Sequence, residues 1–460
     1  MLPRIHFKYR YTAAMKHCDL LVSAPWILPV APHNVALVDH ALAIDAERIV
    51  ALAPQVELEA AYEPRQRLHL PHHILTPGLV NAHGHAAMTL LRGAGEDQPL
   101  ETWLNDTIWP MEAQAMNPEY VGLGTQLAIA EMLQSGTTTF SDMYFYPEVV
   151  APLCVQNGIR AQLAFPLIEF GNPWSENVAD ALHKGLELFH QYRHESLVNI
   201  ALGPHAAYSL AAKDLEQIAM YANELDIMVQ IHLHETAAEV AAAIAATGQS
   251  WIQRLHQIGM LGPELQAVHM TQVTDEELTL IADSGTQVVH CPTSNMKLAS
   301  GYCPVARLKQ VGVNIALGTD GAASNNRLDM FSEMRLAALL AKHENQDAAT
   351  GRAPDILRMA TLDGARALGI DELTGSLEVG KAADFISINT ASLGLMPLYN
   401  PFAALVHGNA GNAVEDVFVN GHQLLKAGAL TQISMPELAQ RVQNWQSAQA
   451  KSSQSHGVPQ

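Results

Sequence analysis

Cysteine is scarce in this sequence, which holds four among 460 residues. They are widely spaced and form no CxxC pair: Cys18, Cys154, Cys291 and Cys303. This spacing predicts neither a disulfide framework nor a thiolate zinc site. Long apolar runs are missing too, since no stretch of 18 apolar residues occurs, which argues against a membrane-spanning helix. The basic residues among the first 16 precede no continuous apolar run, so they predict no secretory signal, and we expect a cytoplasmic protein.

Basic residues are also few relative to acidic ones. Lys and Arg number 26 against 46 Asp and Glu, which gives a formal net charge of −20. A chain this acidic repels a phosphate backbone, and no basic patch interrupts the pattern. We therefore expect neither a nucleic-acid nor a membrane partner. Hydrophobic residues make up 48% and charged residues 16%, which is typical of a globular chain with a sizeable core.

The distribution of apolar residues changes along the chain. Residues 17–75 alternate short apolar or β-branched runs with turn residues, which predicts a small antiparallel sheet. From Thr76 onward, runs of strand length alternate with amphipathic stretches such as 118–134 and 211–223, the pattern of βα repeats. Eight candidate strands occur, the number that a (β/α)8 barrel needs. They are 75–81, 137–142, 159–165, 198–203, 228–233, 265–269, 286–290 and 313–319.

Beyond the eighth strand, residues 332–342 and 354–368 predict helices, and strand character returns in 375–388 and 414–425. We interpret the returning strands as the second half of the small sheet. The predicted fold class is α/β, a (β/α)8 TIM-like barrel with a small β-sandwich domain built from both chain ends. The tail is rich in Ser, Gln and Ala, so we expect it to be disordered. The predicted segments are an N-terminal extension at 1–16, the small domain at 17–75 and 375–430, the barrel at 76–374 and the tail at 447–460.

Ligand-type side chains fall at the C-terminal ends of the predicted strands, where barrel enzymes build their active sites. His83 and His85 follow the first strand, and residues two apart in extended backbone point the same way, while Gly84 lets the chain pass close by. His232 lies at the end of the fifth strand and Asp320 follows the eighth. Three imidazoles and one carboxylate suit Zn²⁺ or another borderline divalent ion, with a further position open for water. We predict these four side chains as metal ligands.

Three side chains are placed for proton transfer beside such an ion, which lowers the pKa of bound water and makes hydroxide available as a nucleophile. Glu235 lies three residues beyond His232, close enough to shuttle a proton without ligating. His269 can orient the water, and Asp320 can accept its proton. For each residue taken singly, a buried polar residue without function is an equal alternative. Because all of them fall at the C-terminal ends of predicted strands, a shared active site is favoured over chance.

Other polar residues at strand ends have simpler explanations. We interpret His234 as a packing residue or as one that supports a ligand, because its neighbours already fill the catalytic roles. His290 receives the same interpretation, as a hydrogen-bond partner of the site. Asp142 stays open between a role in the site and a cap of the segment that follows it.

Four segments carry motifs that recur together in one known family. They are Pro-Gly-Leu-Val-Asn-Ala-His-Gly-His at 77–85, His-Leu-His-Glu at 232–235, Gly-Thr-Asp-Gly-Ala-Ala-Ser-Asn-Asn at 318–326 and Gly-Lys-Ala-Ala-Asp at 380–384. Together they resemble the amidohydrolase superfamily, and within it they are most similar to the 5′-methylthioadenosine/S-adenosylhomocysteine deaminases. The resemblance runs from about Asp19 to Leu425. The combination is highly specific for the superfamily and less specific for the substrate.

The resemblance implies a role for each site residue. The four predicted ligands would hold one Zn²⁺ per subunit, because the fourth strand end lacks the lysine that two-metal relatives often carry there. Glu235 would pass a proton to a purine ring nitrogen, and His269 would hold the attacking water. Glu112 matches the acidic residue that relatives use on the ribose hydroxyls, and a carboxylate can accept from both hydroxyls of a diol. A solvated helix end is the alternative for Glu112. His205 matches another substrate contact.

The implied reaction is hydrolytic deamination of 5′-methylthioadenosine or adenosine to an inosine-type product and ammonia. Relatives that accept S-adenosylhomocysteine can carry arginines after the third strand, but residues 161–180 hold neither Arg nor Lys and offer Phe165, Phe170 and Trp174. Burying a carboxylate without a cation is costly, whereas a thiomethyl group packs well against aromatic rings. S-adenosylhomocysteine is therefore the less favoured substrate, unless another cation such as Arg160 approaches the site. We expect a small-molecule nucleoside as the partner and a homo-oligomer as the assembly.

Two alternatives stay open. A related amidohydrolase acting on guanine, cytosine or a triazine would use the same metal ligands, but only a substrate with a ribose explains Glu112. A catalytically silent scaffold is remote, since it has no reason to keep the ligands and Glu235. Trp103, within 88–106, is a candidate wall for the adenine or the 5′ group, with core packing as an equal alternative.

Overall fold

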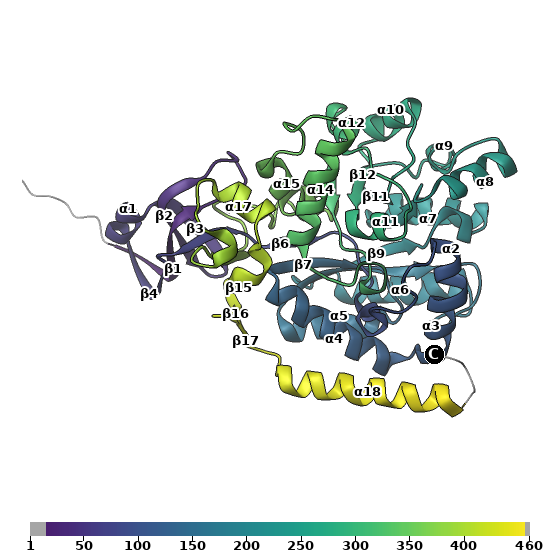
Figure 1. The fold of residues 1–460 in the computed structure, drawn as a ribbon, viewed down its shortest axis with the longest axis horizontal. Coiled ribbons are helices and arrows are strands. Elements are labelled where there is room, and N and C mark those ends of the chain that lie inside the picture. The colour runs from purple at the N-terminus through teal and green to yellow at the C-terminus, as the bar shows by residue number, and fades with distance from the viewer. Residues whose placement is uncertain (1–14, 456–460) are drawn as a thin grey trace, which may run out of the picture.

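Eight parallel strands form a sheet in the structure, a computed structural model that describes residues 15–455. Each strand pairs with the next one along the chain. The first and last are joined just beyond their ends, where Ala82 N–H donates to Leu317 O at 2.9 Å and Asp320 N–H donates to His83 O at 3.0 Å. The sheet is therefore a nearly closed barrel, which confirms the predicted α/β class (Figure 1). Its strands are β6 (Leu79–Asn81), β7 (Thr137–Asp142), β8 (Arg160–Leu167), β9 (Val198–Pro204), β10 (Val229–Leu233), β11 (Leu265–His269), β12 (Gln287–His290) and β13 (Ile315–Leu317).

The first predicted strand, 75–81, is divided between two sheets. β5 (His73–Pro77) belongs to the sheet built from the chain ends, and β6 opens the barrel. Gly78 lies at the crossing, and a Cβ atom there would lie 2.1 Å from Oγ1 of Thr138. Both strands are buried, and the Pro77-Gly78 pair between them is the sequence signal for the break that the single predicted strand overlooked.

Helices cover the outside of the barrel, and several begin at the caps that their sequences offer. The Asn117 side chain accepts from the backbone N–H of Tyr120, and Thr274 forms a capping box with Glu277. No helix within the described residues is long and apolar enough to cross a membrane. The longer helices are α4 (Pro118–Gln134), α5 (Pro147–Asn157), α6 (Val178–Tyr192), α7 (Ala212–Leu225), α8 (Ala237–Thr247), α10 (Asp275–Ser284) and α14 (Met330–Glu344). Shorter ones include α3 (Trp109–Ala115), α9 (Trp251–Gln257), α11 (Pro292–Lys297), α12 (Val305–Gln310), α13 (Ala322–Asn325) and α17 (Pro401–His407).

The helix predicted at 354–368 is two helices, α15 (Ala353–Met359) and α16 (Leu362–Ala367). The break falls at Ala360 and Thr361. The carbonyl of Ala360 accepts from Val80 N–H in the barrel at 2.8 Å. A tertiary hydrogen bond therefore takes the backbone group that a continuous helix would have used.

The two chain ends build one mixed sheet beside the barrel, where β14 pairs antiparallel with β5. The antiparallel prediction for residues 17–75 was only partly right, because β4 and β5 run parallel to β1. Helix α1 (Gln55–Ala61) lies between β3 and β4, and a parallel pairing needs such a longer connection. The nine strands, expected as a β-sandwich, are linked by hydrogen bonds into a single sheet. They are β1 (Lys16–Ile27), β2 (Leu37–Asp45), β3 (Arg48–Pro54), β4 (Tyr62–His69), β5, β14 (Phe385–Asn389), β15 (Val414–Val419), β16 (His422–Lys426) and β17 (Ala429–Leu430).

Of the tail expected to be disordered at 447–460, residues 447–455 instead continue helix α18 (Met435–Ser455), and residues 456–460 lie outside the described part. Figure 1 shows this helix in yellow along one side of the barrel, and it contacts α4. Leu438, Val442 and Trp445 recur at helical spacing and pack into the apolar core. These three apolar residues form one face of an otherwise polar helix, and their burial accounts for its formation. Of the predicted N-terminal extension, residues 1–14 lie outside the described part.

Candidate metal centre and active site

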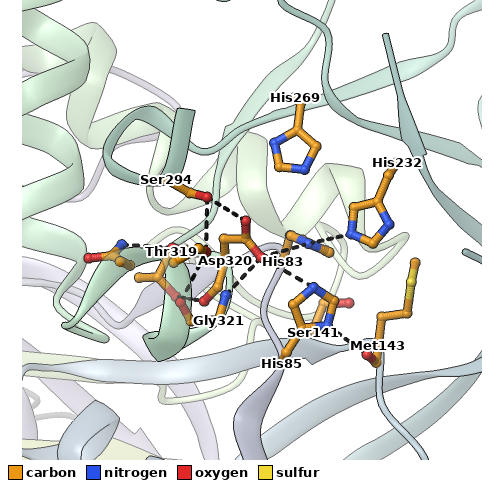
Figure 2. A network of polar contacts seen from close by, with 12 residues as sticks. His83, His85, Ser141, Met143, His232, His269, Ser294, Thr319, Asp320 and Gly321 are labelled. Atoms are coloured by element: carbon orange, nitrogen blue, oxygen red, sulfur yellow. Dashed lines mark hydrogen bonds and ion pairs between the residues drawn. The ribbon is translucent and has the colours of Figure 1, made fainter. Parts of the chain in front are cut away.

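Polar side chains from strand ends all around the barrel meet at one point. His83 and His85 follow β6, His232 lies in β10, His269 ends β11 and Asp320 follows β13. Figure 2 shows these side chains converging on one another. All except His85 are buried, and His85 is nearly so. The structure thus brings together the four residues predicted as ligands and one predicted catalytic residue.

The distances among the predicted ligands are those of one small site. Nε2 of His83 lies 3.2 Å from Nε2 of His232 and 3.5 Å from Oδ1 of Asp320. Nε2 of His85 lies 3.2 Å from the same Asp320 oxygen. Within the groups His83/His85/His232 and His83/His269/Asp320, the potential ligand atoms lie within 4.8 Å of one another. His269 therefore stands beside the metal site, where the sequence predicted a partner for water.

The outward-facing nitrogen of each imidazole is engaged by an oxygen. Nδ1 of His83 lies 2.8 Å from Oε1 of Gln230, Nδ1 of His85 lies 2.7 Å from Met143 O, and Nδ1 of His232 lies 2.7 Å from His205 O. Since a carbonyl oxygen only accepts, Nδ1 carries the proton in each ring. Nε2 is then left with a lone pair that faces the centre, the tautomer that binds a metal.

Two such lone pairs repel each other at 3.2 Å, the separation of the Nε2 atoms of His83 and His232. A divalent cation between them removes the repulsion, and three imidazoles with one carboxylate match the ligand set of Zn²⁺. Burial beside the other imidazoles also holds the pKa of His232 well below its usual value, so the ring is neutral as a metal ligand must be. The residues present therefore fit a zinc ion.

Asp320 is fixed through both carboxylate oxygens. Oδ1 accepts from the backbone N–H of Gly321 at 2.8 Å, and Oδ2 accepts from the hydroxyl of Ser294 at 2.7 Å. Ser294, near the start of α11, was not predicted, and a serine in a short helix after the seventh strand offered little signal.

Three residues at the strand ends adopt left-handed backbone conformations that side chains other than glycine rarely take. They are His234 with φ 52°, His269 with φ 76° and Asp320 with φ 60°. Each costs on the order of 1–3 kcal/mol and persists only where the surrounding structure imposes it. Other non-glycine residues in turns along the chain adopt the same conformation, and these three are the ones at strand ends that carry site residues or their neighbours.

Glu235 lies next to the ligands without joining them. Its Oε1 accepts from the hydroxyl of Ser300 at 3.0 Å, and its Oε2 lies 3.6 Å from Nε2 of His269. Its backbone N–H donates to Oε2 of Glu239 at 2.8 Å. Burial, with a further contribution from Asp320, raises the pKa of Glu235 to about 8. A carboxyl group with this pKa can hold a proton at neutral pH and release it to a stronger base.

The remaining strand-end residues differ in their surroundings. Nδ1 of His269 lies 2.9 Å from Oδ1 of Asn295, which directs Nε2 toward the site. His234 turns away, with Nδ1 2.7 Å from Gln272 O, and is a packing residue. His290 is buried with no hydrogen-bond partner among the described residues, so the structure provides no support for the predicted contact to the site. Asp142 accepts from the N–H of Ala86 at 2.7 Å and caps the segment after His85.

A cavity of about 460 Å³ opens onto these residues. Glu112, His205 and Trp103, predicted to bind substrate, all line it. Glu112 is 8% exposed and Tyr144 donates to it, so the alternative of a solvated helix end is wrong. Trp103 is 5% exposed, and its indole N–H donates to Ala94 O at 3.3 Å. It therefore belongs both to the cavity wall and to the apolar core.

The outer part of the cavity is apolar and carries no positive charge. No Lys or Arg occurs among the residues that line it within the described chain. Of the three aromatic residues expected there, only Phe170 lines the cavity, while Phe165 and Trp174 are buried against each other. Arg160 is at the opposite end of β8, bonded to Asp384, and does not supply the missing cation.

Residues 74–424 match the amidohydrolase family. A 5-methylthioadenosine/S-adenosylhomocysteine deaminase from Teredinibacter turnerae is 48% identical over 427 residues, which cover 93% of this chain and 97% of the relative. A 5′-deoxyadenosine deaminase from Methanothermobacter thermautotrophicus is 42% identical over 359 residues, which cover 78% of this chain and 83% of the relative.

Solved structures agree with the match to the amidohydrolase family. An adenosine deaminase from Xanthomonas campestris with bound zinc superposes with a TM-score of 0.93 at 43% identity, covering 94% of this chain and 99% of the other. An atrazine chlorohydrolase from Arthrobacter aurescens shares the fold, with a TM-score of 0.86 at 22% identity over 92% of this chain and 99% of the other.

Proposed function

This chain belongs to the amidohydrolase family, and on that premise we propose that it is a zinc-dependent deaminase of adenine nucleosides, acting on 5′-methylthioadenosine and adenosine. The names of its relatives support deamination of an adenosine-type substrate. The observation that carries the zinc site is the convergence of His83, His85, His232 and Asp320, with the imidazole lone pairs aimed at one point.

A zinc ion bound there would be held by these four side chains, and it supplies Lewis acidity that makes water nucleophilic at neutral pH. His269 and Asp320 lie where they can orient that water and take up its proton. The ring of His269 is held by Asn295, and the carboxylate of Asp320 by Ser294. Preorganised groups of this kind need little rearrangement during the reaction.

Glu235 is the proposed proton carrier. As water adds to the amine-bearing carbon of the adenine ring, its proton passes to Asp320 and the ring nitrogen beside that carbon gains a proton from Glu235. The amine then takes the proton from Asp320 and leaves as ammonia, while the hydroxyl on the carbon returns a proton to Glu235 and becomes the carbonyl of the inosine-type product. The raised pKa of Glu235 supports this role, because the residue can both hold and return a proton near neutral pH. The hydroxyl of Ser300 fixes the carboxyl group for the transfer.

Glu112 is the proposed contact to the ribose. It is buried in the wall of the cavity that also exposes His205 and Glu235. A buried carboxylate requires hydrogen-bond donors, and the two hydroxyls of a ribose provide them. A free guanine, cytosine or triazine ring has no diol for Glu112, which favours the nucleoside over those alternatives.

The outer cavity supports a preference for an uncharged 5′ group. Met116, Phe145, Ile168 and Phe170 line it, and no cation lies among the lining residues of the described chain. A thiomethyl group gains from contact with aromatic and aliphatic side chains. The amino acid carboxylate of S-adenosylhomocysteine would lose water without gaining a partner.

The test is the ultraviolet absorbance of zinc-loaded protein with 5′-methylthioadenosine, adenosine and S-adenosylhomocysteine in parallel. We expect the adenine-to-hypoxanthine change with the first two, and a loss of about 10²–10⁴ in kcat for Glu235→Gln with its zinc content unchanged. Absence of any change with all three nucleosides would contradict the proposal and direct the search to guanine, cytosine and triazines.

A further inference from the structure

The proposed ribose contact does not stand alone in the cavity wall. The hydroxyl of Tyr144 donates to Oε1 of Glu112 at 2.5 Å. Tyr144 is 4% exposed and lines the same cavity. A carboxylate can accept from several donors, so this bond leaves Glu112 able to accept from a diol as well. Hydrogen bonds to a charged group are stronger than neutral ones, and this one fixes the direction in which the carboxylate points.

The backbone before Tyr144 is bonded to the loop that carries two metal ligands. Met143 N–H donates to Gly84 O at 2.9 Å, and Met143 O accepts from Nδ1 of His85 at 2.7 Å. Oδ1 of Asp142 accepts from the N–H of Ala86 at 2.7 Å. Tyr144 is therefore fixed relative to the metal site, and through its hydroxyl it fixes Glu112 relative to that site too.

A second tyrosine, Tyr120, contacts the hydroxyl of Tyr144. The hydroxyl of Tyr120, in α4, lies 3.5 Å from that of Tyr144. Since Tyr144 gives its proton to Glu112, Tyr120 is the donor between the two hydroxyls. The outer side of Tyr120 contacts Trp445 of α18, with ring centroids 5.9 Å apart. The chain of contacts therefore reaches from the C-terminal helix to the cavity.

We infer that Tyr144 is a positioning residue that makes the site selective for a vicinal diol, by holding Glu112 at a set distance from the metal-binding loop. The ligand class it selects is nucleosides with free 2′- and 3′-hydroxyls. A substrate without them gains nothing from an oriented Glu112. This inference rests on the proposed function, since it takes Glu112 as the ribose contact.

The experiment compares adenosine with 2′,3′-dideoxyadenosine in wild-type protein and in Tyr144→Phe, Tyr120→Phe and Glu112→Gln. For Tyr144→Phe we expect KM for adenosine to rise about tenfold with kcat within about twofold, and KM for the dideoxy compound to stay unchanged. Tyr120→Phe should give a smaller change of the same kind. Tyr302→Phe, a tyrosine outside the cavity lining, is the matched control and should leave both substrates unaffected. Zinc content and the circular dichroism spectrum of each variant report its folding.

The outcomes separate the inference from its premise. If Glu112→Gln abolishes the preference for adenosine while Tyr144→Phe and Tyr120→Phe keep it, the inference is overturned and the ribose contact stands. If Tyr144→Phe lowers turnover of both nucleosides equally, its role is structural and the inference is also overturned. A preference that survives Glu112→Gln overturns the diol contact itself, and a wild-type protein inactive on both nucleosides overturns the proposed function.

Discussion

The guanidinium of Arg160 donates to Oδ2 of Asp384 from Nε at 3.3 Å and from Nη2 at 3.0 Å. Arg160 begins β8 of the barrel, and Asp384 directly precedes β14 of the mixed sheet. Both side chains are almost fully buried, and Arg160 also donates to Asn420 Oδ1 at 2.9 Å. One buried ion pair therefore connects the barrel to the sheet formed by the chain ends.

Replacing one member of this pair leaves the other charge buried without a partner. We expect Arg160→Met to lower the free energy of unfolding by about 3–5 kcal/mol, because an uncompensated buried carboxylate is strongly unfavourable. Urea denaturation followed by circular dichroism measures the change. Arg366→Met is the control, since its partner Asp371 is at the surface and such pairs contribute about 0–1 kcal/mol. Equal shifts for the two variants would contradict the assignment of Arg160 as the link between the sheets.

Removal of the metal should reduce both activity and stability. A chelator leaves the Nε2 atoms of His83 and His232 facing each other at 3.2 Å, and a ligand that binds only the folded state stabilises it. We expect activity to fall at least about 100-fold and the melting temperature to drop, with both restored by Zn²⁺. Elemental analysis should give one zinc per chain, and His83→Ala should hold none. His183→Ala, at an exposed position, should retain the metal; two zinc ions per chain would contradict the single-metal site.

The fold and the ligands of this protein follow from patterns that are local in the sequence. Each barrel strand is a short apolar run, and each ligand lies at the end of such a run, so the closure of eight repeats brings the ligands together. The residues that orient the ligands, in contrast, follow no pattern in the sequence. Ser294, Asn295 and Ser300 all come from the connection between β12 and β13, and ordinary serines and an asparagine give no sign of which side chain they will reach.

Long-range contacts also explain the alternative that the structure removed and the predictions that were wrong. Glu112 was expected either at a ribose or at a solvated helix end, and its burial depends on Tyr144, which lies 32 residues further along. The tail was expected to be disordered from its composition, but α18 is stabilised by contact with α4, which composition does not report. Phe165 and Trp174 were expected in the cavity from their position after the third strand, and they pack into the core instead.

Binding of the ribose should depend on pH through Glu112. Burial raises the pKa of Glu112 to about 7, against a hydrogen bond from Tyr144 that lowers it. A carboxyl group is ionised above its pKa, so Glu112 is a full acceptor at pH 8 and is mostly protonated at pH 6. We expect kcat/KM for adenosine to fall up to about tenfold between pH 8 and pH 6, relative to 2′,3′-dideoxyadenosine. Parallel profiles for the two nucleosides would show that another group governs the decline.

A cation placed at the mouth of the cavity should change the preferred 5′ group. Phe170 lines the cavity and is 60% exposed, so its replacement disturbs little packing. An arginine there can pair with the amino acid carboxylate of S-adenosylhomocysteine through charge-assisted hydrogen bonds. We expect Phe170→Arg to raise the ratio of kcat/KM for S-adenosylhomocysteine over 5′-methylthioadenosine by about tenfold. Phe170→Gln, which has similar length without charge, separates the charge from the loss of the ring. If the glutamine variant raises the ratio as much as the arginine variant, loss of the aromatic ring and not the missing cation limits the larger nucleoside.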